Sequence, residues 1–85
     1  MLTLQFNYQQ IEPQIRQALY DALGPHIAVG TEEVDDGRAF VKVVAPQFNA
    51  LSSADKQTAV WEALRRLGPD AQAVSLVLAF GTDEI

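Results

Sequence analysis

The residues of this chain that could do chemistry are few and lie far apart in the sequence. There is a single histidine, His26, no cysteine, and one acidic run at residues 31–36. Nucleophilic catalysis requires a nucleophile, a base and a group that orients the base, and no such set can be assembled around one imidazole that follows Gly24 and Pro25. The sequence therefore predicts that the protein is not an enzyme and that His26 has a structural role.

The acidic run contains Glu32, Glu33, Asp35 and Asp36. Carboxylates suit hard cations rather than Fe–S iron, and without cysteine the chain has no thiolate ligand and no disulfide. We interpret the run as a solvated turn, and we expect no metal site and no cofactor.

The composition is typical of one globular domain with an acidic surface. The chain has 85 residues, of which 48% are hydrophobic, and this length leaves room for one core. Six Lys and Arg against eleven Asp and Glu give a net charge of −5, which repels nucleic-acid phosphates. No apolar run approaches the ~20 residues of a membrane span, and there is no secretion signal, so we expect a cytoplasmic protein.

Two amphipathic helices are expected. The apolar face of the first recurs every three or four residues and consists of Ile11, Ile15, Ala18, Leu19 and Ala22. Because proline is tolerated best in the first turn, Pro13 predicts a start near Gln9–Glu12. Ser52 followed by Asp55 predicts the start of the second helix, which should end at residues 68–70.

Three strands are expected around these helices. Residues 26–34 and 38–45 should form an antiparallel hairpin turning at Asp36-Gly37, and residues 71–80 should form the last strand. The order α-β-β-α-β predicts a single two-layer α+β domain over residues 1–85, with both helices on one face of a small three-stranded sheet. Residues 1–8 are interpreted either as an extra edge strand or as a flexible arm.

Strand alternation also predicts which residues the helices leave uncovered. If Val41 and Val43 are covered together with Val74, Leu76 and Leu78, the other face carries small and apolar residues around one lysine. That face would hold Phe40, Lys42, Val44, Ala73, Ser75, Val77 and Ala79. Such a surface is typical of a docking patch for another protein or for self-association.

Four segments of the sequence resemble the core of a BolA-family domain in order and spacing, over about residues 11–80. They are residues 40–44 (FVKVV), Phe48 with Leu51-Ser52, Val60 with Leu64, and residues 73–76 (AVSL). The resemblance implies a fold related to the class II KH arrangement. It also implies a role beside monothiol glutaredoxins in Fe–S cluster handling, or in stress-related transcriptional regulation.

The positions that carry function in that family differ in this chain. Gln72 corresponds to the family histidine that opens the last strand, and an amide is a poorer iron ligand than imidazole. The acidic run corresponds to the hairpin loop that supplies the second family ligand, and Lys56-Gln57-Thr58 corresponds to the basic signature of the second long helix. We therefore predict a domain that binds by protein contact without ligating a cluster.

The favoured function is a non-catalytic protein-interaction domain whose partner is another protein, with a monothiol glutaredoxin as the candidate. The predicted partner-binding residues are Phe40, Lys42, Val44, Lys56, Gln57, Ser75 and Val77. The alternative is a KH-like nucleic-acid-binding module, or transcriptional regulator, that uses Lys42, Lys56, Arg65 and Arg66. The net charge and the lack of a Gly-x-x-Gly loop in a basic setting disfavour this alternative. Trp61 is expected to pack at the border of the second helix.

Overall fold

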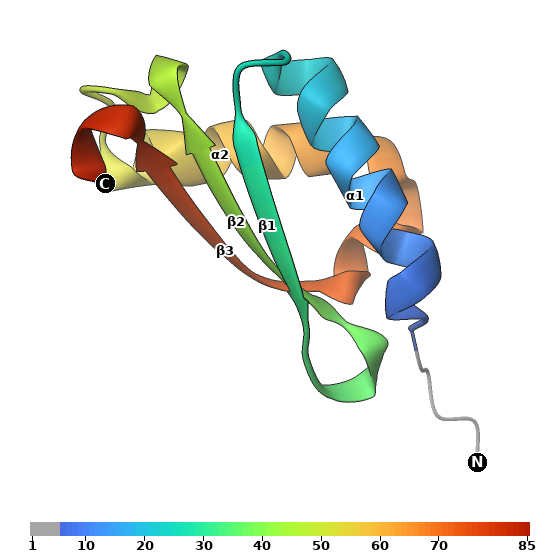
Figure 1. The fold of residues 1–85 in the computed structure, drawn as a ribbon. Helices are drawn as coiled ribbons and strands as arrows, with labels where there is room; N and C mark the ends of the chain where they lie inside the picture. The colour runs from blue at the N-terminus through green and yellow to red at the C-terminus, as the bar shows by residue number, and fades with distance from the viewer. Residues whose placement is uncertain (1–5) are drawn as a thin grey trace.

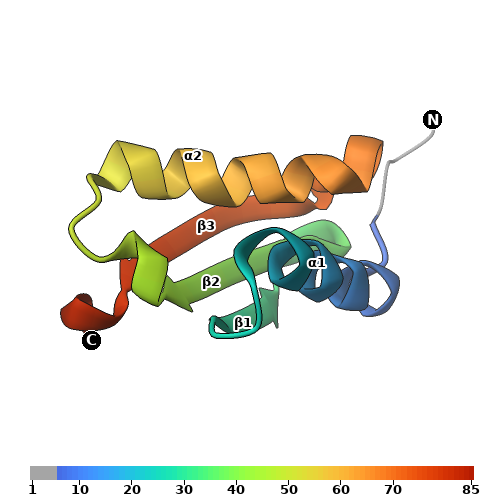
Figure 2. The same cartoon turned by 90° about the horizontal axis from the view of Figure 1, so that it is seen from above.

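Two helices cover one face of a three-stranded sheet in the computed structural model, which describes residues 6–85 (Figures 1 and 2). The elements follow the predicted order. They are α1 (Tyr8–Leu23), β1 (Ala28–Glu33), β2 (Ala39–Ala45), α2 (Ser53–Leu64) and β3 (Val74–Gly81). Short 3-10 turns join them and end the chain: η1 (Asp35–Gly37), η2 (Pro46–Phe48), η3 (Arg65–Ala73) and η4 (Thr82–Glu84). The α+β class and the placement of both helices on one face are confirmed.

The central strand of the sheet is β2. It pairs with β1 in antiparallel fashion, as the predicted hairpin requires, and with β3 in parallel fashion. The parallel pairing follows from the crossover through α2, which returns the chain to the end of the sheet where β2 began. In Figure 2, α2 lies along the β3 side of the sheet and α1 lies on the β1 side.

The first helix begins slightly earlier than predicted. Asn7 is its N-cap, because the side chain Oδ1 accepts a hydrogen bond of 3.1 Å from the backbone N–H of Gln9. This cap fixes the start at Tyr8, so that Pro13 falls in the second turn and leaves the carbonyl of Gln9 without its helical donor. The helix ends at Gly24, whose φ of 91° is accessible to glycine.

The predicted N-cap of the second helix is confirmed, but the last strand begins later than predicted. The backbone N–H of Asp55 donates to Ser52 Oγ at 3.1 Å. The regular helix ends at Leu64, and η3 occupies the residues up to Ala73, with Gly68 at a φ of +60°. The last strand therefore begins at Val74 rather than at residue 71.

The core lies between the sheet and the helices. It contains Ile11, Ile15 and Leu19 from α1, the odd-numbered residues 39–45 of β2, Val60 and Leu64 from α2, and Phe48 from η2. The strands supply mostly β-branched residues, which pack well on a pleated surface. The predicted helical and strand periodicity places all of these side chains on the inner face except that of Phe48, which lies in an irregular link between elements.

A β-bulge in β3 changes the predicted faces of that strand. Ala39 pairs with Val74, but the next residue, Phe40, pairs with Leu76, so Ser75 is an extra residue on the β3 side. A one-residue shift moves all following side chains to the opposite face. Val77 is therefore buried at 3% exposure, and Ala79 packs against the core. Ala73 is buried as well, but it precedes the shift and is the last residue of η3. The placement of Ala73, Val77 and Ala79 on the uncovered face is wrong.

The N-terminal prediction falls partly outside the described residues. The structure does not describe residues 1–5, which include Leu2 and Leu4. Phe6 donates its backbone N–H to the carbonyl of Asp36 at 2.9 Å, and Tyr8 already belongs to α1. Within residues 6–85, no helix is both long and apolar enough to cross a membrane.

The face assignment of β3 can be tested by two alanine substitutions at adjacent positions. Val77→Ala should lower the free energy of unfolding by about 2 kcal/mol, because it removes two buried methyl groups and leaves a cavity. Leu78→Ala should change it by less than about 0.5 kcal/mol, because the side chain is on the uncovered face. Urea denaturation followed by Trp61 fluorescence measures both. The reverse order of effects would contradict the bulge.

Candidate functional site

The uncovered face of the sheet carries a continuous apolar surface on its two longest strands. Even-numbered residues of β2 and β3 are Cα partners in the parallel ladder, so their side chains lie side by side on this face. We call this surface the open sheet face, and it consists of Phe40, Lys42, Val44, Leu76, Leu78 and Phe80. The predicted positions of Phe40, Lys42 and Val44 are confirmed, since Lys42 is exposed and the other two are half-buried.

Leu76 and Leu78 belong to the open sheet face, although strand alternation predicted that the helices would cover them. Leu76 is 51% exposed and Leu78 is 38% exposed, and Phe80 is partly exposed beside them. The predicted burial of Leu76 and Leu78 beneath the helices is wrong, because the extra residue Ser75 moves the side chains that follow it to the opposite face of the sheet. The Ser75 side chain is exposed at the margin of this surface, and its Oγ donates to the carbonyl of Ala39 at 3.3 Å.

The one lysine of the open sheet face lies against an aromatic ring. The Lys42 Nζ is 5.5 Å from the centroid of the Phe80 ring, within the range of a cation–π interaction. On the neighbouring strand, Gly30 is the Cα partner of Lys42 and has no side chain, while Glu32 is the Cα partner of Phe40. The face therefore has apolar residues around one central cation, and an acidic margin on β1.

Lys56 is not part of an exposed surface. Its side chain is buried, and its Nζ forms an ion pair with Glu84 Oε1 in η4. The same carboxylate oxygen accepts the backbone N–H of Gly81 at 2.9 Å. The hydrogen bond from Lys56, followed by that from Gly81, lowers the pKa of Glu84. Lys56 thus fastens the C-terminal turn to the first turns of α2.

Gln57 joins α2 to the outer edge of β3. Its Nε2 donates to the carbonyl of Val77 at 2.8 Å, and its Oε1 accepts the indole N–H of Trp61 at 3.2 Å. Trp61 is 37% exposed beside it, consistent with the predicted position at the border of α2. Both polar ends of Gln57 are therefore used within the fold.

Gln72 and the acidic turn lie at the same end of the sheet. Glu33, Ala39 and Val74 are neighbours across the three strands, so η1 and the end of η3 flank this end. Gln72 is exposed there, whereas His26 precedes β1 and so lies at the opposite end. Within residues 6–85, no three His, Asp or Glu side chains are arranged so that they could hold a metal ion.

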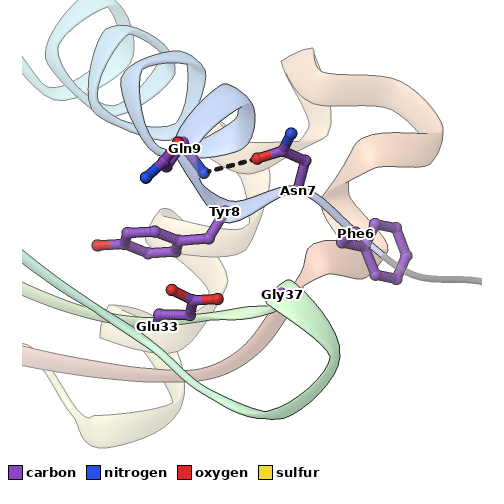
Figure 3. A pocket seen from close by; sticks show the side chains of 6 residues that line it. All are labelled: Phe6, Asn7, Tyr8, Gln9, Glu33 and Gly37. Carbon is purple, nitrogen blue, oxygen red and sulfur yellow. Dashed lines mark hydrogen bonds between the residues drawn. The ribbon is translucent and has the colours of Figure 1, made fainter.

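A polar depression of about 380 Å³ lies next to this end, between the start of α1 and the acidic turn (Figure 3). It is lined by Phe6, Asn7, Tyr8, Gln9, Glu33 and Gly37. Asn7 caps the helix, and the Tyr8 hydroxyl is 2.7 Å from Thr31 Oγ1. The lining groups include no nucleophile with an adjacent base, so the depression has no evident catalytic chemistry.

The four cations of the nucleic-acid alternative are not brought together. Lys42 is on the open sheet face, Lys56 is buried, and Arg65 and Arg66 follow α2 in the helical layer. Arg66 also lies 3.9 Å from the carboxylate of Asp21. A phosphate backbone could not contact all four from one side.

The combination of a three-stranded mixed sheet, two helices on one face and the order α-β-β-α-β is a BolA-like fold. The solved structure of BolA1 from Arabidopsis thaliana matches with a TM-score of 0.66 at 18% sequence identity, and the match covers 86% of this chain and 93% of that chain. No protein-family model and no curated protein sequence matches. The likeness establishes the fold, and the function is argued from the residues.

The ion pair at the C-terminal turn gives a pH-dependent contribution to stability. Because the pKa of Glu84 is lowered in the folded state, the carboxylate stabilises the fold above its unfolded pKa, and this contribution is lost as the pH falls through the folded pKa. Glu84→Gln should therefore lower the melting temperature at pH 7, and the difference from wild type should shrink below about pH 4.3. Thermal unfolding by circular dichroism between pH 7 and pH 3 measures this.

Asp83→Asn is the matched control in the same turn, since Asp83 forms no ion pair within residues 6–85. It should leave the melting temperature at pH 7 nearly unchanged. An equal loss in both variants would mean that net charge, rather than the Lys56 contact, sets the effect of Glu84.

Proposed function

We propose that this chain is a non-catalytic protein-interaction domain of BolA-like fold that binds its partner through the open sheet face. The observation that supports the proposal is the exposure of Leu76 and Leu78 in one surface with Phe40, Val44 and Phe80. Contiguous exposed apolar side chains on a small domain are costly in water and are typical of interaction sites.

The composition of the open sheet face matches the anatomy of an interface. Its centre lacks carboxylates, and Lys42 is its one charged residue. Interface centres are depleted in charge and enriched in aromatic residues, and charged groups at the margin orient the partner. Lys42 would pair with an acidic side chain of the partner, and Phe40 and Phe80 would supply the aromatic contacts.

The partner that we propose to test is a monothiol glutaredoxin, on the basis of the fold and of the resemblance in sequence. In such a complex this chain would contribute contact area and no cluster ligand. Gln72, at the end of the sheet beside the acidic turn, offers an amide without a basic nitrogen, and the turn offers carboxylates. Any cluster in the complex would then be held by ligands from elsewhere.

Co-expression with a monothiol glutaredoxin tests the proposal. A heterocomplex should form on size-exclusion chromatography, and Phe40→Ser or Lys42→Glu should each raise the dissociation constant about tenfold or more, as expected at the centre of an interface. Tyr20→Ser is the control, because Tyr20 is an exposed aromatic residue on α1, in the helical layer. Isothermal titration calorimetry of the purified chains measures the constants.

Three outcomes would contradict parts of this function. Unchanged affinity in the Phe40 and Lys42 variants would exclude the open sheet face. A coloured complex whose absorption is lost in Gln72→Ala would show that this chain ligates the cluster after all. Retardation of DNA or RNA that weakens steeply with salt would favour the nucleic-acid alternative.

A further inference from the structure

The two edges of the sheet differ in the charge of their strands. At the β1 edge, Arg16 Nη1 donates to the carbonyl of Val29 at 2.8 Å, Tyr8 contacts Thr31, and Glu32 and Glu33 add charge. The β3 edge is formed by eight residues, VSLVLAFG, with no charged residue and no proline. Charges and prolines are the usual means by which edge strands avoid pairing with another chain. The uncharged β3 edge is therefore a candidate for strand pairing.

Two side-chain hydrogen bonds show which backbone groups of β3 point away from β2. Gln57 binds the carbonyl of Val77 from outside the sheet, and Glu84 binds the N–H of Gly81. Because backbone direction alternates along a strand, the N–H of Val77 and both polar groups of Ala79 must point outward as well. Among the hydrogen bonds of residues 6–85 that lie outside the regular helices and strands, none involves these three groups.

Apolar side chains flank the same edge on both faces of the sheet. Leu76 and Leu78 lie on the open side, and Trp61 lies on the helical side, linked to the edge through Gln57. Trp61 also lines a groove of about 470 Å³ together with Thr58, Glu62, Arg65 and Ala71. A strand added to β3 would cover these side chains as well as the free backbone groups. Figure 2 shows β3 as the outermost strand on this side.

We propose that β3 pairs with β3 of a second copy of this chain, antiparallel about a two-fold axis at Leu78, so that the two sheets become one. In this register Val77 of one copy lies opposite Ala79 of the other, and each free N–H meets an outward carbonyl. Only the hydrogen bond from Gln57 to Val77 is displaced, and the contact between Glu84 and Gly81 is kept.

A second copy fits this edge better than a charged segment would. The chain carries a net charge of −5, yet β3 carries none, so pairing β3 with itself creates no like-charge contact within the strand. Antiparallel pairing also brings η3 of one copy, with its exposed Arg65, to the end where η4 of the other carries Asp83. The long-range repulsion is thus relieved at both ends of the paired strands.

The inference goes beyond the proposed function because it rests on the backbone edge of β3, although Leu76 and Leu78 also belong to the open sheet face. Pairing at the edge leaves Phe40, Lys42 and Val44 in the middle of each open face, available to another protein. A failure of the glutaredoxin experiment would leave the pairing intact, and a failure of the pairing would leave the open sheet face intact.

Sedimentation velocity of the full chain alone, over a concentration series, tests the pairing. The wild type should dimerise reversibly. Leu78→Glu should raise the dissociation constant tenfold or more, because two carboxylates would face each other across the axis. Within one copy the substitution should be tolerated, because the new carboxylate lies beside Lys42, the Cα partner of residue 78. Leu51→Glu is the matched control, since Leu51 and Leu78 are both 38% exposed, and it should not change the constant.

Gln57→Met provides a change in the opposite direction. It removes the donor that competes for the Val77 carbonyl in each copy, so the dissociation constant should fall about 25-fold, which corresponds to one net hydrogen bond in each of the two copies. A wild type that stays monomeric at about 1 mM overturns the proposal. An equal rise of the dissociation constant in the Leu51 variant also overturns it. Amide signals of Val77 and Ala79 that shift only when a glutaredoxin is added would overturn it too, because they would assign the edge to a different partner.

Discussion

The parallel pairing of β3 with β2, with Ser75 as an extra residue, is the constraint on which the rest of the surface depends. It places Val77 in the core and turns Leu76, Leu78 and Phe80 outward beside Phe40, Lys42 and Val44. Without the extra residue, the small side chains of β3 would face solvent and its large ones would lie under α2. The same pairing leaves β3 as an outer strand, so one register sets both the open sheet face and the free edge.

The helices do more than cover the core, because each also sends polar side chains to the edges of the sheet. Arg16 reaches the carbonyl of Val29 on β1, and the pKa of its guanidinium is raised mainly by its hydrogen bond to Glu12. Gln57 reaches Val77 on β3, and Lys56 holds η4 through Glu84. Lys56 and Gln57, which correspond to part of the basic signature of the resembled family, thus position the sheet and the C-terminal turn. What distinguishes the two edges is charge, since β1 carries Glu32 and Glu33 and β3 carries no charged residue.

Much of the fold could be read from periodicity and capping. Three features could be predicted because each depends only on neighbouring residues. They are the apolar face at Ile11, Ile15 and Leu19, the cap at Ser52 and the turn at Asp36-Gly37. The faces of β3 could not be read in this way. Val74, Leu76 and Leu78 alternate perfectly in the sequence, and a bulge between them is a property of the pairing with β2 rather than of the strand. The roles of Gln57 and Lys56 likewise depend on partners 20 and 28 residues away.

The sequence by itself determined a small acidic α+β domain with the order α-β-β-α-β, since hydrophobic spacing, caps and turn residues act over a few neighbouring residues. It also determined the residue types that a site could use, with one histidine, no cysteine and Gln72 before the last strand. Only the tertiary structure decided which apolar side chains reach solvent, that Gln72 and the acidic turn share one end of the sheet, and which edge is left unprotected. Those properties arise from strand register and from contacts between distant segments, which no local pattern specifies.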